Sequence, residues 1–284
     1  MKDRARCALI TGASQGLGRA FAEECAGRGM ALVLVALPGT GLVELTRILE
    51  RAYQVPIEAI ECDLTRPEVP AQIAVRCRAR GFDVDTLINN AGVGFTSSFA
   101  QSSASQNGAT VQLNVAALVR LTQEMLPALQ EKQRAWILNV ASLGAFFPMP
   151  SMPVYSSTKV FVLTFSRLLR AELRGSGVRV SALCPNGIRT NRATRELIER
   201  QGLVGRLTCR FPDEVARAGL RGLFRGAAVI VPGLANQVLA GASPLVPQGL
   251  YMRVISRRWA PAAQGRSHAA SLGPARVASA PSTL

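Results

Sequence analysis

The sequence predicts an α/β protein: a single doubly wound domain with a parallel sheet of seven strands and a disordered C-terminal tail. Three observations support this fold class. Short apolar runs alternate with amphipathic stretches along most of the chain, a glycine-rich turn follows the first run, and several runs are apolar throughout. A strand buried on both faces has no polar positions, so such runs are typical of a parallel sheet covered by helices.

Strands are predicted at the apolar runs and helices at the stretches between them. The clearest strand is Ala-Leu-Val-Leu-Val-Ala at residues 31–36. The seven predicted strands are residues 7–10, 31–36, 57–62, 86–89, 136–141, 178–184 and 227–231. The predicted helices are one that follows the glycine-rich turn and runs to Gly27, four at residues 42–53, 71–80, 105–129 and 154–174, and a short amphipathic helix after the last strand.

The chain divides into one domain and a tail. Residues 1–258 are expected to form the folded domain. Within it, residues 187–207 are polar and rich in arginine, which indicates a mobile lid between regular elements. From Pro261 the composition turns to alanine, serine, proline and arginine, so residues 259–284 are expected to be disordered.

The positive charge is concentrated in the C-terminal part of the chain. The net charge is +15, no acidic residue follows Glu214, and eight arginines do, which leaves +7 for the first 214 residues. A preference for arginine over lysine accounts for much of this excess. No nucleic-acid partner is expected, because no binding motif and no interleaved aromatic residues accompany the charge.

Cysteine and histidine usage excludes several kinds of site. The six cysteines are scattered, which argues against a zinc cluster and for free thiols in a reducing compartment. The only histidine, His268, lies in the tail, so histidine triads and histidine metal sites are not expected. No metal is predicted. Acidic residues interrupt the first 30 positions, so no secretory signal is expected and a cytoplasmic location is favoured.

One uncharged segment, residues 226–252, is long enough to span a bilayer. Pro232, Pro244 and Pro247 interrupt it, so a strand followed by a short amphipathic helix is the favoured interpretation. Weak peripheral contact of residues 234–258 with a membrane surface remains an open alternative, because arginines follow the apolar segment.

A glycine-rich turn joins the first strand to the first helix. In Thr-Gly-Ala-Ser-Gln-Gly-Leu-Gly at residues 11–18, Gly12 permits a tight turn, Gly16 lets a pyrophosphate approach the backbone, and Gly18 lets the helix pack on the strand. The N–H groups of the helix N-terminus then suit an anion. This pattern predicts a dinucleotide site, although an ordinary glycine-rich turn is the alternative for the motif taken alone.

Tyr155 and Lys159 stand four residues apart on a predicted helix, and therefore on one face. A free phenol has a pKa near ~10, and a neighbouring cation lowers it. The pair is therefore a candidate acid/base, although such spacing also occurs by chance. Lys159 is one of only three lysines in the chain, which makes chance a weaker explanation.

Over residues 5–233 the chain resembles the short-chain dehydrogenase/reductases, which have a Rossmann fold, and its motifs occur in the family's order. Residues 11–18 resemble the family's TGxxxGxG motif and residues 89–92 its NNAG motif, which stabilises the central sheet. Ser142, thirteen residues before Tyr155, is similar in position to the catalytic serine. Two stretches near Tyr155, Phe-Pro-Met-Pro at residues 147–150 and Thr-Lys-Val-Phe-Val at residues 158–162, resemble the branch that contains long-chain 3-oxoacyl and steroid reductases.

The resemblance implies a role for each candidate residue. Ser142 would orient the substrate oxygen and Tyr155 would exchange a proton with it. Lys159 would bind the nicotinamide ribose and depress the tyrosine pKa, and Asn114 would hold a proton-relay water. The implied cofactor contacts are Gly12, Ser14, Gln15, Gly16, Leu17, Gly18, Asp63, Leu64, Asn90, Ala91, Gly92, Tyr155, Lys159, Pro185, Gly187, Ile188 and Thr190.

The chain departs from the family pattern at two places. Asn186 stands between Pro185 and Gly187 where the family has Pro-Gly, and asparagine tolerates left-handed backbone. The loop after the second strand, residues 36–41, carries neither the acidic residue of NAD enzymes nor the arginine of NADP enzymes. With no carboxylate to repel a 2′-phosphate, and with Ser14, Thr40 and glycine N–H groups nearby, NADP(H) is favoured over NAD(H).

The expected reaction is interconversion of a ketone and a secondary alcohol by hydride transfer. Phe146, Phe147, Met149 and Met152 are expected to line an apolar pocket, which favours an apolar substrate such as a 3-oxoacyl thioester. Val160, Phe161 and Phe165 are expected to pack within their helix. The basic residues of the predicted lid add to this expectation of an acyl-thioester ketone, although an ordinary solvated helix face is the alternative for them: Arg189, Arg192, Arg195 and Arg200.

Two rival functions share the fold. A non-catalytic dinucleotide sensor or scaffold protein would bind cofactor without turnover, but such relatives lose the tyrosine or the lysine, and both are present. A sugar-nucleotide epimerase or dehydratase has a longer C-terminal domain than this chain provides. The resemblance also implies a homodimer or homotetramer, paired through the helices of Asn114 and Tyr155.

Overall fold

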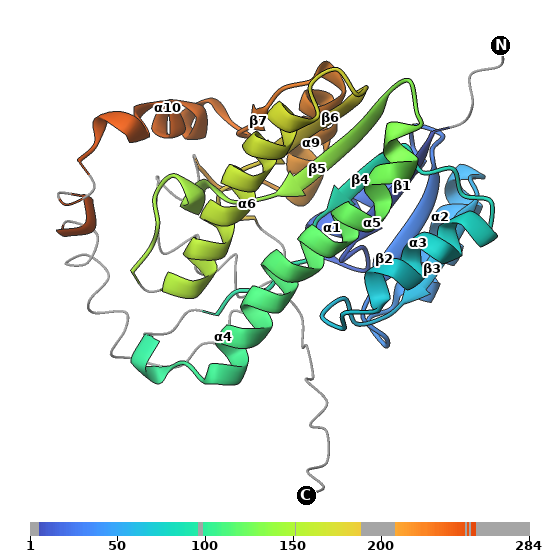
Figure 1. The fold of residues 1–284 in the computed structure, drawn as a ribbon, viewed down its shortest axis with the longest axis horizontal. Helices are drawn as coiled ribbons and strands as arrows, with labels where there is room; N and C mark the ends of the chain where they lie inside the picture. Colours follow the sequence, from blue (N-terminus) through green and yellow to red (C-terminus); the bar gives the residue numbers. More distant parts are fainter. Residues whose placement is uncertain are drawn as a thin grey trace, which may run out of the picture.

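Seven parallel strands form one sheet in the order β3-β2-β1-β4-β5-β6-β7 (Figure 1). The computed structural model describes residues 6–95, 99–150, 152–188, 208–247, 249 and 251–253. The doubly wound α/β fold predicted from the sequence is confirmed. The strands are β1 Cys7–Thr11, β2 Ala31–Ala36, β3 Ile57–Glu61, β4 Thr86–Asn89, β5 Ala135–Val140, β6 Val178–Leu183 and β7 Val229–Ile230.

Helices cover both faces of the sheet. One core lies between the sheet and α1, α2 and α9, and a second lies between the sheet and α3, α5 and α6. The helices are α1 Gly16–Ala26, α2 Leu42–Tyr53, α3 Val69–Ala79, α4 Ala104–Val111, α5 Leu118–Gln130, α6 Pro153–Glu172, α9 Pro212–Arg225 and α10 Leu234–Ala242. Short helical turns are η1 Phe99–Gln101, η2 Gln112–Ala117, η3 Leu143–Ala145 and η4 Ser243–Leu245.

Successive residues of each central strand serve the two cores in turn. In β2, Leu32 and Leu34 belong to the first core, whereas Val33 and Val35 belong to the second, and all four are fully buried. Side chains alternate across a strand, so a strand that is apolar at every position fills both layers. This requirement explains why the strands were recognisable from continuous apolar runs.

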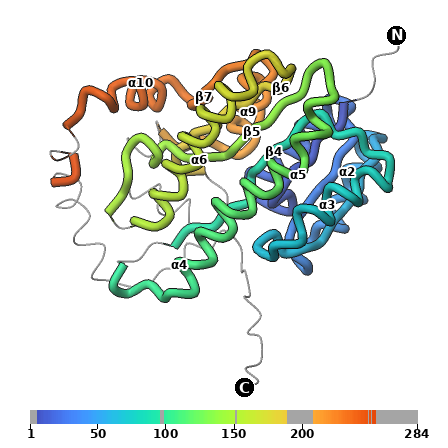
Figure 2. Tube along the Cα trace, in the orientation of Figure 1, coloured from blue at the N-terminus to red at the C-terminus, as the bar shows by residue number. Residues whose placement is uncertain are grey.

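The long helix predicted at residues 105–129 is interrupted by a π-helical turn. The chain runs from α4 through η2 into α5, and Figure 2 shows the three segments as one continuous rod. A π turn inserts extra backbone into a helix and redirects the side chains that it carries. The periodicity of the sequence did not indicate this turn, and Asn114 lies within it.

Helix α9 was not predicted, although its ends carry recognisable signals. Pro212 occupies the first turn, Asp213 and Glu214 place negative charge there, and Gly226 closes the helix with a φ of +78°. Its apolar face packs on α1, where a Cβ on Gly219 would lie 3.3 Å from the ring of Phe21. A side chain at this position would require its neighbours to shift by a few tenths of an ångström.

The remaining differences from the sequence-based expectations are small. Strand β7 is shorter than the predicted residues 227–231, and α6 ends two residues before the predicted residue 174. The short helix after the last strand is α10. No helix in the described part of the chain is long and apolar enough to cross a membrane. Most of the predicted lid, including its four arginines, and the predicted tail lie outside the described residues.

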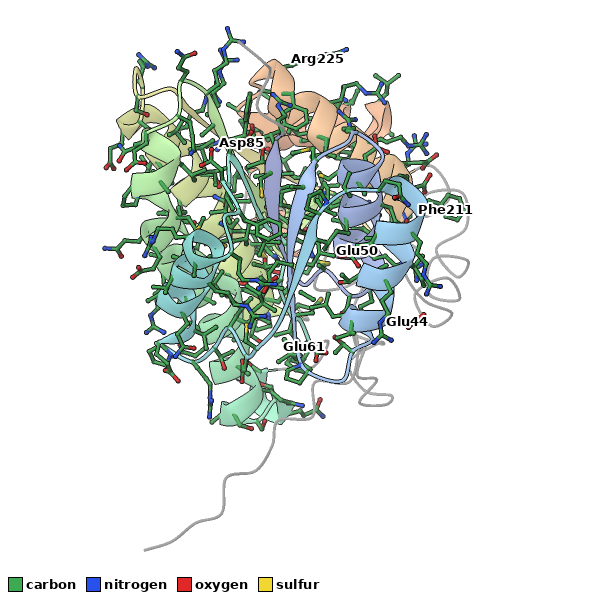
Figure 3. All side chains as sticks on the ribbon, turned by 90° about the vertical axis from the view of Figure 1, so that its right-hand side faces the viewer. Glu44, Glu50, Glu61, Asp85, Phe211 and Arg225 are labelled. Atoms are coloured by element: carbon green, nitrogen blue, oxygen red, sulfur yellow. The ribbon has the colours of Figure 1, made fainter. Side chains whose placement is uncertain are left out.

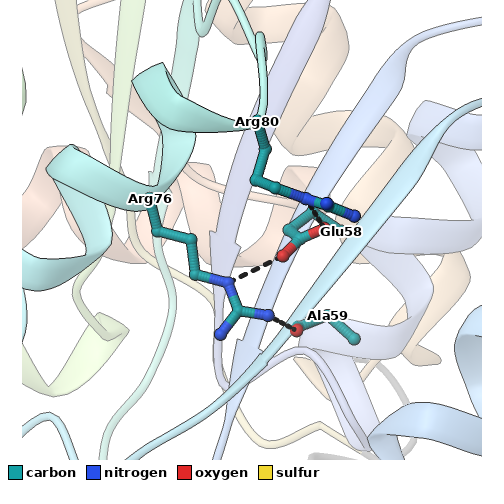
Figure 4. A network of polar contacts seen from close by, with 4 residues as sticks. All are labelled: Glu58, Ala59, Arg76 and Arg80. Carbon is teal, nitrogen blue, oxygen red and sulfur yellow. Dashed lines mark hydrogen bonds and ion pairs between the residues drawn. The ribbon is translucent and has the colours of Figure 1, made fainter.

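Glu58 joins the edge strand β3 to α3 (Figure 4). Its side chain is only 7% exposed, and its two carboxylate oxygens accept from Arg76 Nε at 2.7 Å and Arg80 Nε at 3.2 Å. Arg76 also donates to the carbonyl of Ala59 at 3.3 Å. Because an unpaired carboxylate is costly in such a position, the two guanidinium groups allow an acidic residue to face α3 from the sheet edge.

We predict that Glu58→Gln destabilises the fold modestly. The two arginines are more than half exposed, so solvent screens the pairs and the expected loss is about 1 kcal/mol, or about 2–4 °C in Tm. Glu44→Gln is the control, because Glu44 and Arg47 form a wide, exposed pair at 3.8 Å. Thermal unfolding of both variants measures the difference, and equal Tm values would contradict the prediction.

Candidate active site

The glycine-rich turn lies at the carboxyl end of β1, where α1 begins. Gly12 has a φ of +64°, and a Cβ there would lie 3.0 Å from Ala91 Cα. A Cβ on Gly18 would lie 2.0 Å from the carbonyl oxygen of Gly12, so α1 packs directly on the turn. The side chain of Gln15 does not cap the helix, and no acidic residue stands in its first turn. The N-terminus of α1 is therefore suited to an external anion.

Asn90 ties β4 to this turn. Its side-chain amide donates to the carbonyl oxygens of Thr11 at 2.9 Å and Gly12 at 3.3 Å. In return, the Thr11 hydroxyl accepts from the backbone N–H groups of Asn90 and Ala91, both at 3.0 Å. The residues of the predicted NNAG motif thus hold the ends of two adjacent strands in register.

Asn89 belongs to a buried polar chain that crosses the sheet from α5 to α6. Its amide donates to Thr122 Oγ1 and to Asn139 Oδ1, each at 2.9 Å. Asn139 in turn donates to Ser166 Oγ at 3.0 Å, and Ser166 donates to the carbonyl of Val162. Hydrogen bonds are strong in such a dry interior, so this chain fixes α6 relative to β4 and β5.

Asn114 projects from the π turn into the centre of the site and is 1% exposed. Its amide nitrogen donates to the carbonyl of Val93 at 2.9 Å and to Thr158 Oγ1 at 3.0 Å, and its oxygen accepts from Val93 N–H at 2.8 Å. Thr158 donates onward to the carbonyl of Tyr155 at 2.7 Å. Asn114 therefore connects the segment after β4 directly to the helix of Tyr155.

Ser142, Tyr155 and Lys159 meet where β5 ends beside α6. Ser142 Oγ accepts from Gly144 N–H at 3.1 Å and hydrogen-bonds the phenol of Tyr155. Lys159 is 5% exposed, and its Nζ donates to the carbonyl of Val140 at 2.8 Å and lies 5.7 Å from the centre of the Tyr155 ring. The residues that the sequence singled out are thus brought together.

The pKa of Tyr155 is shifted in the direction opposite to the sequence-based expectation. Burial raises the pKa of Tyr155, and the hydrogen bond from Ser142 offsets this only in part. Burial lowers the pKa of Lys159 to about 8, opposed by the neighbouring Cys184 thiol. The expected depression of the tyrosine pKa by Lys159 is not found in this structure, in which the ammonium donates to the Val140 carbonyl.

Two glycines after β4 fit closely against these side chains. A Cβ on Gly92 would lie 3.1 Å from Asn114 Oδ1 and 3.4 Å from Lys159 Nζ. A Cβ on Gly94 would lie 2.6 Å from Cδ2 of Tyr155. Gly94 was not predicted to be a site residue. The only signal in the sequence was its position two residues beyond the NNAG motif.

A small cavity of about 10 Å³ lies beside Tyr155. Of the four residues predicted to line an apolar pocket, only Met152 contributes to it. Phe146 instead packs on the core of α6 and β6, and Phe147 contacts Tyr251 with ring centres 5.4 Å apart. The cavity is lined by Phe95, Ser102, Asn107, Thr110, Met152, Pro153, Val154 and Tyr155. Its lining mixes apolar and polar groups.

The helix residues beyond Tyr155 are only partly buried in packing. Phe165 packs on two cores and stacks on Phe161 with ring centres 5.8 Å apart. Phe161 is itself exposed, and Val160 is half-buried. Of the three residues expected to pack within their helix, Phe165 is the one that is best packed.

The other implied cofactor contacts lie at the same edge of the sheet. Asp63 follows β3 and accepts from the backbone N–H and the hydroxyl of Thr65. Pro185 follows β6 and accepts from Leu143 N–H at 2.7 Å. Among described non-glycine residues only Gln54 has a positive φ, so Asn186 is not left-handed. Thr190 lies outside the described residues.

Comparison with known proteins identifies the family. Residues 6–201 match the short chain dehydrogenase family. The chain belongs to this family. Very-long-chain 3-oxoacyl-CoA reductase-B of Danio rerio is 31% identical over 189 residues, which cover 63% of this chain and 58% of the relative. The 17-beta-hydroxysteroid dehydrogenase type 3 of Rattus norvegicus is 27% identical over 261 residues, covering 91% and 82%. The resemblance to this branch is confirmed.

Solved structures of short-chain dehydrogenases superpose on the chain. A bulky-bulky ketone specific alcohol dehydrogenase from Comamonas testosteroni is 31% identical with a TM-score of 0.70, covering 93% of this chain and 97% of that one. A Sphingobium yanoikuyae enzyme in complex with NADPH is 33% identical with a TM-score of 0.70, covering 94% and 98%. A Burkholderia phymatum enzyme in complex with NAD is 26% identical with a TM-score of 0.73, covering 85% and 93%. The two dinucleotides both occur among these relatives, so they establish no preference.

We predict that Gly94→Ala lowers turnover without unfolding the protein. The new methyl group would overlap the Tyr155 ring and displace the phenol, and such misplacement costs about 10–100-fold in kcat. The control is Gly108→Ala in α4, where a Cβ meets nothing within 4 Å. Turnover of any ketone or alcohol that the wild type accepts, together with Tm, separates the two variants. Wild-type kcat in Gly94→Ala would show that the ring is not held by this contact.

Proposed function

We propose that this protein is a nicotinamide-dependent oxidoreductase that interconverts a ketone and a secondary alcohol. The observation that carries the proposal is the convergence of Ser142, Tyr155 and Lys159 beside the glycine-rich turn. A hydroxyl, a phenol and an ammonium at one sheet edge can bind, protonate and orient an oxygen-bearing substrate. None of these groups can supply or accept a hydride, so the reaction requires a redox cofactor.

The residues present suit NAD(H) or NADP(H). Gly12 and Gly16 both have positive φ, and the uncapped N-terminus of α1 offers backbone N–H groups to a pyrophosphate. Gly92 has no side chain that would block the approach to Lys159. The Lys159 ammonium is therefore the group to bind the nicotinamide ribose hydroxyls. When bound, the dinucleotide supplies or accepts the hydride.

In the reductive direction, Tyr155 donates a proton to the substrate oxygen. Burial favours its neutral phenol, which is the form that a proton donor requires. Ser142 donates a hydrogen bond to the same oxygen and fixes its distance from the phenol. Asn114 holds the segment after β4 against α6, so that Gly94 and Tyr155 keep their relative positions.

The substrate is an apolar ketone, and a 3-oxoacyl thioester is the class we favour. Met152 and Phe95 present apolar surface beside Tyr155. The matched relatives are named as 3-oxoacyl-CoA and steroid enzymes, and one solved relative is named for bulky ketones. The non-catalytic sensor or scaffold alternative gains no support from these matches, because the relatives carry the names of reductases and dehydrogenases.

We predict that Tyr155→Phe abolishes turnover and preserves dinucleotide binding. The variant keeps the ring but removes the proton donor, so kcat should fall at least about 10²–10⁴-fold. A panel of 3-oxoacyl thioesters, steroid ketones and simple ketones, assayed with NADH and NADPH by absorbance, measures turnover and identifies the substrate class. Phe161→Tyr is the control, because it adds a phenol to the exposed side of the same helix. Unchanged turnover in Tyr155→Phe would refute the proposed role, and failure of every thioester would remove that substrate class.

We also propose that the protein forms a homodimer or homotetramer in the cytoplasm. Exposed apolar side chains on α4 and α6 support self-association, namely those of Val111, Phe161 and Leu168. Helix α4 continues into η2, which carries Asn114, and α6 carries Tyr155. The family resemblance implies that subunits pair through these helices.

Helix α10 supports the further proposal of weak contact with a membrane surface. It lies at the outer edge of the molecule (Figure 1), and Leu234 and Val238, one turn apart, are 78% and 71% exposed. Leu245 in η4 extends this apolar surface, and Arg253 follows it. An apolar helix face followed by basic residues suits an anionic lipid surface.

We predict that Leu234→Asp with Val238→Asp lowers binding to phosphatidylglycerol vesicles several-fold in co-sedimentation. The control is Ile48→Asp, which places the same charge at an exposed apolar position on α2. Binding to neutral phosphatidylcholine vesicles should be weaker for the wild type. If the wild type and the double variant co-sediment equally with phosphatidylglycerol vesicles, α10 does not contact the membrane surface.

A further inference from the structure

The loop between β2 and α2 lies against an acidic residue of the next strand. Ala36, the last residue of β2, is directly opposite Glu61, the last residue of β3. In Figure 3, Glu61 lies at the lower end of β3, and Glu44 lies in the first turn of α2. Glu61 Oε1 accepts from the backbone N–H of Gly39 at 3.3 Å. A carboxylate is therefore bound to the loop that, in the sequence, carries no acidic residue.

Two hydrogen-bond donors of this loop are already engaged. The N–H of Gly39 is directed to Glu61, and the hydroxyl of Thr40 donates to the carbonyl of Leu37 at 2.7 Å. These are two of the donors on which the sequence-based preference for NADP(H) relied. The loop itself, residues 37–41, contains no lysine or arginine that could neutralise a phosphate.

The hydrogen bond between Glu61 and Gly39 lies in the loop just beyond β2. In doubly wound dinucleotide-binding folds, the residue that distinguishes the two cofactors meets the adenosine ribose just beyond the second strand. An acid there accepts from the 2′-hydroxyl, whereas a base there pairs with the 2′-phosphate. A phosphate carries about −1.5 to −2 charges at neutral pH, so a neighbouring carboxylate repels it.

We propose that Glu61 is the residue through which this site discriminates against the 2′-phosphate, so that NAD(H) binds more tightly than NADP(H). The acid is supplied by β3 rather than by β2, which is why the loop sequence did not show it. The inference rests on the proposed function only in requiring that a dinucleotide binds. It reverses the preference expected from the sequence. For a pair separated by about 5 Å in solvent, the repulsion corresponds to roughly tenfold in affinity.

The test compares dinucleotide affinities without reference to turnover. Dissociation constants for NADH and NADPH are measured by fluorescence titration in the wild type, Glu61→Gln and Glu44→Gln. Competition by 5′-AMP and 2′,5′-ADP, which differ only by the phosphate, isolates the ribose contact. Glutamine keeps a side-chain oxygen for Gly39 N–H, so the loop conformation is retained while the charge is removed. Glu44→Gln removes the same charge from the adjoining helix, where the carboxylate is exposed.

The wild type should bind NADH about tenfold more tightly than NADPH, and Glu61→Gln should remove most of that ratio by improving NADPH affinity. Glu44→Gln should leave the ratio within about twofold of the wild type. A wild type that prefers NADPH, or a ratio unchanged in Glu61→Gln, would overturn the proposal, as would the absence of binding by either dinucleotide. Binding with the expected ratio but no turnover of any ketone would instead contradict the proposed function and leave this inference supported.

Discussion

The hydrogen bonds between Thr11 and Asn90 are the contact on which the site depends. They join β1 to β4, the two strands between which the strand order reverses direction. Ligands of doubly wound folds bind in the crevice at such a reversal, because the loops on either side diverge to opposite faces of the sheet. By fixing both strand ends, the Thr11 hydroxyl and the Asn90 amide place the glycine-rich turn next to the segment that contacts Asn114 and Tyr155.

A second layer of polar contacts orients α6, the helix that carries Tyr155, from beneath. The chain from Thr122 through Asn89 and Asn139 to Ser166 crosses two strands, and each of these side chains is at least 95% buried. Buried polar groups restrict packing to arrangements that supply most of them with partners, and in this chain Asn89 Oδ1 is left without one. Helix α6 therefore has little freedom to slide along the sheet, and Asn114 adds a direct link at the end of α6 that carries Tyr155.

The parts of the structure that depend on local sequence were predictable, and those that depend on contacts between distant segments were not. The strands were found because burial on both faces demands continuous apolar runs. Spacing and motif singled out Tyr155, Lys159, Ser142 and Asn114, which the structure brings close together. Helix α9 is an exception: it was missed although Pro212 and Gly226 mark its ends and its apolar residues form one buried face.

Other features had no local signal. The π turn, residues Gln112–Ala117, contains no glycine or proline to mark it, so the local sequence did not reveal the environment of Asn114. The tyrosine pKa depends on how deeply the ring is covered, and the direction of Lys159 depends on a strand carbonyl nineteen residues away. Glu61 reaches Gly39 only because two strands pair in a particular register.

The buried ammonium of Lys159 links occupancy of the crevice to proton uptake. With a pKa of about 8, it is partly neutral in mildly alkaline solution, and it donates to the carbonyl of Val140. A guest whose hydroxyl oxygens accept from it stabilises the charged form and raises that pKa, so filling the crevice near pH 8 draws a proton from the buffer. Affinity for such a guest consequently weakens as the medium becomes more alkaline.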